Sequence, residues 1–488
     1  MDNLKEKTAR GLFWSLMNSG STQVLNLVIG IVLARLLTPD DYGIVGVLTI
    51  FTAIGGALQA SGFSNALINL REPTSRDYTS VFWFNVIAST AIYTVLFMAA
   101  PLIARFFHQP CLTAVSRLVF LTLPISALGI TLNVWMTKNM MNREMAVSGI
   151  VSLVASGAVG ITLAILGYTY WSLACQQVAY SVVLNLCRYY YVRWRPEPHL
   201  DFGPVRRMFG FSMNVLTTHI VNILNQNILT FAFGRLFAIG TVGNYSQANK
   251  WNTMAHSLIT NAIGQLSQTV FASVTDDNDR EIRVFRKMMR FTSFLCFPLM
   301  LGLALTAREF ILLTIGEKWE DSVMLLQILA VGSSFAPLYI LFQHLIMSRG
   351  HSSVYMWCSV GQVTVQLIFV VTLARLGIVT LVTAYSALTV AWLAVWQTAA
   401  HKLVGIRLAD TMRDVLPFLT VALATMAATY VITMPIAPGQ SKWSCLLLLT
   451  VRIIVAAALY CGTLRLLHAR VLEECITFLK SKRNNPGT

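Results

Sequence analysis

Charged residues are scarce in this sequence. Asp, Glu, Lys and Arg together make up 12% of the 488 residues, about half of the ~25% that is typical of soluble proteins. Hydrophobic residues make up 56%. A soluble chain of this length could not cover its surface with so few charges, and the high apolar content excludes a disordered chain. The composition therefore predicts a polytopic membrane protein.

The sequence also lacks the motifs of several enzyme classes. Its eight cysteines are too sparse for a disulfide scaffold and form no CxxC pair. No P-loop, HExxH, GxSxG or DFG-like motif occurs, so ATP hydrolysis, protease chemistry and esterase chemistry lack support. No basic groove with interleaved aromatic residues indicates a nucleic-acid partner. We expect no catalytic residue, no metal site and no cofactor, and we leave open whether H⁺ or Na⁺ serves as a coupling ion.

Long apolar runs occur along the whole chain. A bilayer core of ~30 Å needs about twenty helical residues, and about fourteen stretches of this kind can be placed. The predicted spans are Leu12–Ala34, Tyr42–Asn69, Tyr78–Ile103, Val115–Thr137, Ser148–Gly167, Tyr170–Cys187, Phe209–Phe233, Gly243–Ser273, Met288–Thr306, Ser322–Met347, Val354–Ala374, Ile378–Ala400, Val415–Met434 and Cys445–Leu466. The sequence thus predicts an all-α membrane protein whose first span is retained rather than cleaved as a signal peptide.

The positive charges predict an orientation. The chain has a net charge of +15, and most of its 36 Lys and Arg residues fall in alternate connecting segments, beginning with the N-terminus. Because Lys and Arg concentrate on the cytoplasmic side of membrane proteins, both termini are expected in the cytoplasm. An incorrect number of spans would scramble this alternation.

Polar residues mark the start of two spans. Thr38, Pro39 and Asp41 form the pattern of a capped helix start before the second span, and Thr74–Asp77 does the same before the third. Asp40 and Asp41 also lie in a predicted outer loop, where some membrane glycosyltransferases place catalytic acids. Helix capping explains this acidic pair more simply.

The end of the first span is repeated later in the chain. Arg35-Leu36 and Arg235-Leu236 lie 200 residues apart, and each pair precedes a tyrosine, Tyr42 or Tyr245, at the start of the next span. Six spans separate the copies, so both run in the same direction across the membrane. The sequence therefore predicts duplicated halves related by an axis along the membrane normal.

The predicted spans contain cations but no acidic residue. All 21 Asp and Glu residues fall in predicted loops or tails. The ionisable residues inside spans are Arg117, Lys250, Arg452, His219, His256 and His344. Burying a cation costs at least ~2.5–3.5 kcal/mol, so an anionic ligand in a hydrated cavity is one explanation. The alternatives are a side chain that stretches to water, for Arg117, and a peripheral role, for Arg452.

Three spans carry polar side chains at helical spacing. These side chains are Ser15, Asn18, Thr22 and Asn26 in the first span, Asn214, Thr218, Asn222 and Asn225 in the seventh, and Asn249, Asn252, His256 and Thr260 in the eighth. Hydrogen bonds between helices explain part of this pattern. Continuous amide-rich faces are also suited to a hydrated cavity that binds the hydroxyl groups of a sugar.

Several local motifs identify a family resemblance. They are Gly11-Leu12-Phe13-Trp14, the segment from Ala34 to Gly43, Gly62–Ile68 and Thr79–Asn85, with weaker matches at Trp171-Ser172-Leu173 and Gly243-Asn244-Tyr245. The chain resembles the Wzx-type polysaccharide exporters of the multidrug/oligosaccharidyl-lipid/polysaccharide superfamily. The span number and the repeat extend this resemblance over the whole chain.

The resemblance implies an architecture and a substrate. It implies two six-helix lobes, residues 1–200 and 201–405, and two C-terminal helices with a cytoplasmic tail in 406–488. It further implies alternating access in the bacterial inner membrane, with spans one, two, seven and eight lining a cationic cavity. The expected substrate is an undecaprenyl-diphosphate-linked oligosaccharide, and polysaccharide polymerase or assembly proteins are expected partners. The expected substrate contacts are Lys250, Arg117, Arg35, Arg235, Arg452, Asn18, Asn26, His219, Asn222, Asn252 and His256.

Two other functions stay open at this point. A multidrug efflux transporter of the same superfamily would need buried carboxylates for cationic drugs, whereas the predicted buried charges are positive. A membrane-embedded glycan polymerase or ligase generally needs a large outer loop, and the predicted outer loops are modest in length. Neither alternative is excluded by the sequence.

Overall fold

The computed structural model describes residues 20–60, 63–198, 201–274, 277–435, 442–467, 469 and 471–474. Within these ranges the chain forms helices and no strand. The helix Gly20–Leu36 precedes α2 (Pro39–Gly46), α3 (Thr49–Ala60), α4 (Phe63–Asn69), α5 (Ser75–Phe106), α6 (Leu112–Phe120), α7 (Thr122–Lys138), α8 (Asn142–Ile165), α9 (Thr169–Tyr191) and α10 (Gly203–Leu236). The remaining helices are α11 (Ile239–Val274), α12 (Asn278–Thr314), α13 (Asp321–Ser333), α14 (Ala336–Ser348), α15 (Ser352–Leu373), α16 (Ile378–Val404), α17 (Leu408–Thr433) and α18 (Lys442–Leu466).

Within the described residues the predicted spans fall on helices, which confirms the all-α membrane fold; residues 12–19 of the first predicted span lie outside the described ranges. In the described ranges, ten helical segments are long and apolar enough to cross a membrane, and Gly20–Leu36 is a shorter apolar helix. The more polar helices α9, α10 and α11 are not among the ten. The number fourteen therefore stays a prediction.

Three predicted spans are not continuous helices. Tyr42–Asn69 is divided into α2, α3 and α4, Val115–Thr137 into α6 and α7, and Ser322–Met347 into α13 and α14. At three of these breaks a hydroxyl donates to the carbonyl three residues before it: Thr49 to Gly46 (2.7 Å), Thr122 to Val119 (2.7 Å) and Ser334 to Val331 (2.7 Å). Such hydroxyls compete with the helical backbone for its carbonyls, which the hydrophobicity of a span does not reveal.

The predicted helix starts are confirmed. The Thr38 hydroxyl accepts a hydrogen bond from the Asp41 backbone, and the Asp41 carboxylate accepts one from the Thr38 backbone at 2.9 Å, with Pro39 in the first turn. Thr74 and Asp77 make the same reciprocal pair at the start of α5. Both are capping boxes. The buried Asp41 therefore has a structural role that accounts for its position.

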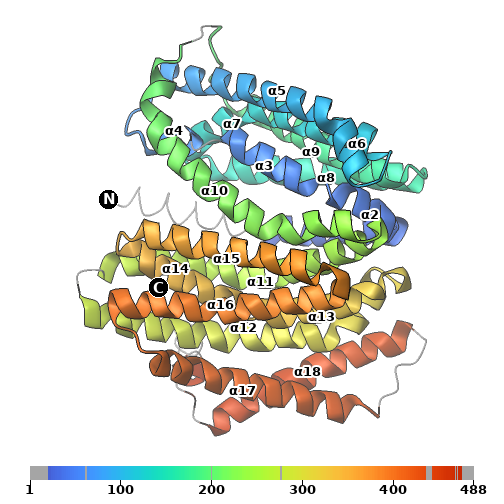
Figure 1. Cartoon of the computed structure of the whole chain (residues 1–488), viewed down its shortest axis with the longest axis vertical. Helices are drawn as coiled ribbons and strands as arrows, with labels where there is room; N and C mark the ends of the chain where they lie inside the picture. Colours follow the sequence, from blue (N-terminus) through green and yellow to red (C-terminus); the bar gives the residue numbers. More distant parts are fainter. Residues whose placement is uncertain are drawn as a thin grey trace. The chain divides into compact units, whose positions relative to one another are not determined.

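The chain packs as two units, residues 1–246 and 247–488 (Figure 1). In unit 1, α8 packs along α9, α7 contacts both α5 and α9, and α10 packs on α3. In unit 2, α12 packs against α13, α17 and α18, and α16 contacts α13 and α15. The predicted division into 1–200, 201–405 and 406–488 stays a prediction.

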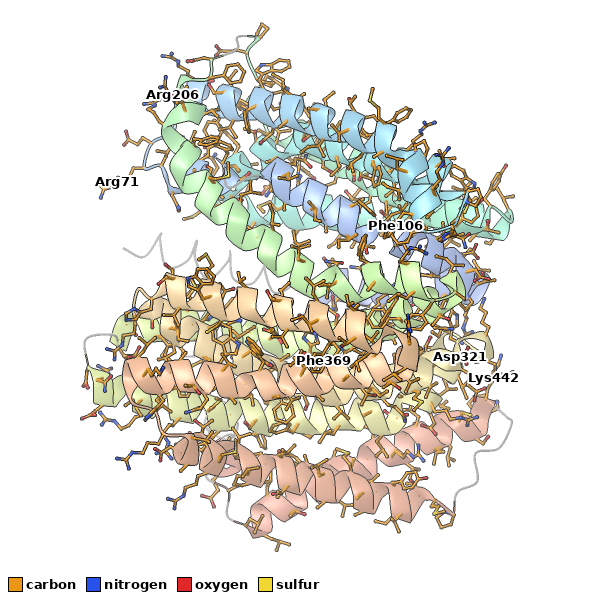
Figure 2. The ribbon with its side chains drawn as sticks, in the orientation of Figure 1. Arg71, Phe106, Arg206, Asp321, Phe369 and Lys442 are labelled. Carbon is orange, nitrogen blue, oxygen red and sulfur yellow. The ribbon has the colours of Figure 1, made fainter. Side chains whose placement is uncertain are left out.

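Each unit has two ends that agree with the predicted alternation of loops. Arg71 and Arg206, both in predicted inner segments, lie toward the same end of unit 1, and Phe106 lies toward the other end (Figure 2). Asp321 and Lys442, both from predicted outer loops, lie toward one end of unit 2 (Figure 2). Loops assigned to one side of the membrane are therefore grouped within each unit.

A reciprocal contact in unit 1 supports the internal repeat. A Cβ atom on Gly43 would lie 2.0 Å from the Ile239 carbonyl oxygen, and one on Gly243 would lie 1.8 Å from the Pro39 carbonyl oxygen. The two contacts exchange equivalent positions 200 residues apart, as in an interface with two-fold symmetry. Only glycine permits so close an approach of two backbones. Each repeated segment thus contacts the other through the same pair of equivalent positions.

Candidate functional site

A polar cavity of about 570 Å³ lies inside unit 1. Five helices contribute to it: Gly20–Leu36, α3, α7, α8 and α9. The lining residues are Thr22, Asn26, Thr52, Gly56, Gln59, Thr122, Leu123, Ser126, Leu153, Ser156, Gln176, Gln177, Tyr180 and Ser181. None of the described residues in this lining carries a charge. Its volume lies in the ~300–1,000 Å³ range of small-molecule sites.

Hydroxyl groups line the cavity with their hydrogens already engaged. Thr122 donates to the Val119 carbonyl at 2.7 Å, Ser156 to the Leu153 carbonyl at 3.2 Å, and Ser181 to the Gln177 carbonyl at 3.2 Å. A hydroxyl oxygen has two acceptor lone pairs in addition to its single donor. Each of these groups can therefore accept a hydrogen bond from a ligand without losing its own bond to the helix.

Amide groups supply hydrogen-bond donors to the cavity, in addition to the acceptors that the hydroxyls provide. Gln59 is 2% exposed, and its Nε2 donates to the Leu123 carbonyl at 2.9 Å, which fixes one wall of the cavity. Asn26, Gln176 and Gln177 are half-buried and line the same space. Because each amide has two N–H donors and an acceptor oxygen, the cavity combines donors with acceptors and has no net charge.

The α9 wall of the cavity was not predicted. Gln176, Gln177, Tyr180 and Ser181 are spaced so that all four fall on one side of a helix. The predicted span Tyr170–Cys187 therefore contains polar side chains at helical spacing, as the first span does. Thr52, Gly56 and Gln59 on α3 form a second unnoticed stripe with the same spacing. Both stripes could have been found by the same search for helical periodicity.

Two residues of the predicted polar face of the first span lie on this cavity. Thr22 and Asn26 line it, as the periodicity indicates. Asn18, the other predicted contact in this span, lies outside the described residues. Asn222 belongs to α10, but its side chain is outside the described part of the structure. The exposed His219 on the same helix is not among the lining residues.

The three predicted arginines of unit 1 do not line the polar cavity. Arg35 and Arg235 are exposed, near the ends of Gly20–Leu36 and α10. Nη1 of Arg235 lies 3.2 Å from Nδ1 of His108, and its guanidinium lies 5.5 Å from the Phe106 ring centroid. The guanidinium of Arg117 lies 4.2 Å from the Phe97 ring centroid. Aromatic rings therefore stabilise two of these cations.

Lys250, Asn252 and His256 lie on α11 within unit 2. The half-buried Lys250 has its ammonium 5.8 Å from the Trp251 ring centroid, and no ion pair forms at Lys250 within the described ranges. Asn252 is buried, and its Nδ2 donates to Ser333 Oγ at 2.8 Å. Nδ1 of His256 lies 3.3 Å from Thr260 Oγ1. Asn252 thus links two helices, whereas Lys250 has a charge without a carboxylate partner.

The expectation that the cations inside predicted spans have no carboxylate partner is wrong for Arg452, which pairs with Glu309. The predicted span ended at Thr306, but α12 continues to Thr314. Glu309 therefore lies inside the helix, where it is 4% exposed and pairs with Arg452 at 2.9 Å. Arg452 also donates to Thr433 Oγ1 at 3.2 Å and to the Leu305 carbonyl at 3.3 Å. An internal ion pair thus explains the buried Arg452.

Unit 2 contains a second cavity, of about 530 Å³, between α12, α17 and α18. Its lining is almost entirely apolar and includes Phe294, Leu299, Met426 and Ile453. Arg452 is the charged residue among the described lining residues. In the described part of the chain, no group of three or more His, Cys, Asp or Glu side chains is placed to hold a metal ion.

Comparison with known proteins gives a family match over more than half of the chain. The family described as polysaccharide biosynthesis protein matches residues 32–324. The lipopolysaccharide biosynthesis protein WzxC of Escherichia coli is 25% identical over 337 residues, which cover 67% of each chain. The succinoglycan biosynthesis transport protein ExoT of Rhizobium meliloti is 23% identical over 71% of this chain and 70% of its own length. The teichuronic acid biosynthesis protein TuaB of Bacillus subtilis is 23% identical over 83% of both chains.

Solved structures share the fold. The lipid II flippase MurJ in an inward closed conformation has a TM-score of 0.73 at 11% identity, over 93% of this chain and 99% of its own. An inward-facing multidrug resistance MATE transporter of the MOP superfamily has a TM-score of 0.55 at 14% identity, over 83% and 95% of the two chains. These structures confirm the fold, and the family match over residues 32–324 confirms the resemblance that the local motifs indicated.

Proposed function

The chain belongs to the polysaccharide biosynthesis protein family, and we propose that it transports a lipid-linked oligosaccharide across the bilayer as a flippase. The family match over residues 32–324 carries this proposal. Relatives named for lipopolysaccharide biosynthesis and succinoglycan transport support it, as does the fold shared with a lipid II flippase. No relative in these comparisons is named as an enzyme of bond formation.

The proposal extends to the substrate and the membrane. The transported molecule is an undecaprenyl-diphosphate-linked repeat unit, moved by alternating access from the cytoplasmic leaflet of the inner membrane. The N-terminus and C-terminus lie in the cytoplasm, in agreement with the distribution of Lys and Arg. A polysaccharide polymerase would receive the product on the outer side.

Lys250 is the proposed contact for the diphosphate. Its ammonium is half-buried on a membrane helix and has no carboxylate partner in the described residues. A buried cation without a counter-ion is stabilised when an anionic ligand supplies one. Arg117, Arg35 and Arg235 are further candidates. Arg452 is a weaker one because Glu309 already neutralises it.

The experiment is replacement of Lys250 by alanine in a strain that depends on this protein. We expect export to be abolished and complete lipid-linked repeat units to accumulate on the cytoplasmic side, as measured by mass spectrometry of lipid-linked sugars in oriented membrane vesicles. Lys250→Arg keeps the charge and should retain part of the export. Lys402→Ala, at an exposed position on α16, is the matched control.

The same measurement separates the other two functions. A strain without a polymerase or ligase would show single repeat units already on the outer side. A strain without a multidrug efflux transporter would show normal lipid-linked sugars and altered drug resistance. Normal export by Lys250→Ala, at wild-type protein level, would remove Lys250 from the substrate path.

A further inference from the structure

We infer that the polar cavity of unit 1 binds one uncharged, hydroxyl-rich sugar unit of the transported molecule. The inference rests on the proposed function for the source of the sugar, but the site is defined by the cavity itself. Residues from five helices of unit 1 line it, and it is open on one side. Three properties of the lining favour a sugar: its hydrogen-bonding groups, its lack of charge and its open space.

The hydrogen-bonding groups match those of a sugar. Every sugar hydroxyl is both a donor and an acceptor. The hydroxyls of Thr122, Ser156 and Ser181 keep acceptor lone pairs toward the cavity because their hydrogens go to backbone carbonyls. The amides of Gln176 and Gln177 provide donors on the α9 wall. A ligand with alternating donors and acceptors can therefore be satisfied on several sides at once.

The lack of charge selects against acidic ligands. No cation lies among the described lining residues, so the carboxylate of a uronic acid or a phosphate would enter without a counter-ion. Burying an unpaired anion is much more costly than burying a hydrogen-bonded hydroxyl. The site therefore distinguishes a neutral sugar from an acidic one, and it is chemically separate from the diphosphate contact proposed at Lys250.

The open space is maintained by a glycine that packing does not require. A Cβ on Gly56 would meet no atom of the described residues within 4 Å. Glycine in the interior of a helix such as α3 is destabilising relative to alanine, and no close neighbour among these described residues explains its presence here. The absence of a side chain leaves room for a ligand beside Gln59, whose amide is held by the Leu123 carbonyl. Tyr180 on α9 supplies a flat ring surface on the cavity wall.

The test is sugar binding by the full purified chain in lipid nanodiscs. The probes are methyl α-D-glucopyranoside, methyl α-D-galactopyranoside and the corresponding methyl glucuronide, followed by saturation-transfer NMR. We expect a saturable signal for at least one neutral glycoside and none for the glucuronide. Gly56→Leu fills the cavity and should weaken binding by at least about tenfold, the scale of a lost fit in a ligand pocket.

A graded variant and a control variant make the result specific. Gly56→Ala adds a single methyl group to the cavity wall and should weaken binding less than Gly56→Leu does. Gly302→Leu places the same leucine in the apolar cavity of unit 2, where the nearest atom to a Cβ is Met426 Cε at 3.7 Å. It should leave sugar binding unchanged and shows that an added leucine in a membrane helix is tolerated.

Three outcomes would overturn the inference: no neutral glycoside binds, the glucuronide binds equally well, or Gly56→Leu binds as the unaltered chain does. The binding assay requires no transport, so its outcome is independent of the proposed function. Normal export together with absent sugar binding rejects the sugar site alone. The converse result is also possible. If sugar binding depends on the cavity but export is normal both in Lys250→Ala and in a strain lacking the protein, the flippase function is rejected and the sugar site is kept.

Discussion

The two units contain cavities of similar size and opposite chemistry. The cavity in unit 1, of about 570 Å³, is lined by hydroxyls and amides from five helices. The cavity in unit 2, of about 530 Å³, is lined by aliphatic and aromatic side chains around one buried ion pair. Neutral polar groups and an isolated charge pair are therefore kept apart in the chain. Polarity inside this protein is thus local, and it cannot be inferred for one unit from the other.

The difference also bears on how each unit is stabilised. In unit 1 these hydroxyls donate to backbone carbonyls three or four residues before them, so the lining tolerates an occupant or water. In unit 2 the buried charges satisfy each other across α12 and α18, and removal of one partner leaves the other uncompensated. The ion pair therefore links α12 to α18, whereas these three hydroxyls of unit 1 bond to backbone carbonyls close to them in the sequence.

The largest effect is expected when the ion pair is broken. Glu309→Leu leaves Arg452 as an uncompensated buried cation and should lower stability by about 3–5 kcal/mol. The double variant Glu309→Leu/Arg452→Leu should recover most of this loss, because it removes both buried charges. Heat-induced unfolding of the purified protein, followed by size-exclusion chromatography, measures both.

The control for this prediction is the exposed pair of Arg308 and Glu320, at 3.2 Å. Arg308→Ala should change stability by no more than about 1 kcal/mol, since exposed pairs contribute little. Equal stability of Glu309→Leu and the unaltered chain would show that Arg452 finds another partner. The ion pair would then no longer distinguish the unit 2 cavity from the unit 1 cavity.

A smaller loss of stability is expected when a polar residue of the unit 1 cavity is replaced by an apolar one. Gln59→Leu removes the donor to the Leu123 carbonyl and leaves that acceptor without its partner, at a cost of about 1–3 kcal/mol. Thermal unfolding measures the loss, and the exposed Gln265→Leu on α11 is the control. An unchanged unfolding temperature would mean that water replaces the amide.

The smallest effects are expected at the two cavity glycines. Gly56→Ala and Gly302→Ala should each stabilise the chain by about 0.5–1 kcal/mol, because alanine is the better helix residue and neither Cβ meets a close atom. Equal gains would show that the two cavities differ in chemistry and not in packing. A loss at either position, measured by the same unfolding assay, would reveal a contact at that cavity that is closer than the structure gives.

Much of the fold follows from local patterns in the sequence. Hydrophobic runs predict the helices, and Thr38 and Thr74 predict helix starts that the structure confirms. The breaks within three spans were missed, because a hydroxyl that binds a nearby carbonyl does not interrupt hydrophobicity. Glu309 was missed for a related reason: the span length was set by the bilayer thickness, and α12 extends beyond it.

The candidate site was only partly predictable. Periodicity places Thr22 and Asn26 on one face, but it does not say which other helices meet that face. The α9 residues Gln176 and Tyr180 had a comparable pattern, and their relation to Asn26 is a property of packing alone. The partner of Arg452 could not be predicted either, since the two residues of that ion pair lie far apart in the sequence and on different helices.

The reciprocal glycine contact has a consequence for how the two copies can diverge. Gly43 meets Ile239, and Gly243 meets Pro39, with no room for a side chain at either position. Insertion of a single residue between Pro39 and Gly43 would rotate one segment by about 100° on a helix of 3.6 residues per turn, and both contacts would be lost together. No substitution in the other copy restores them. The two contacts therefore constrain these two short segments to keep equal length.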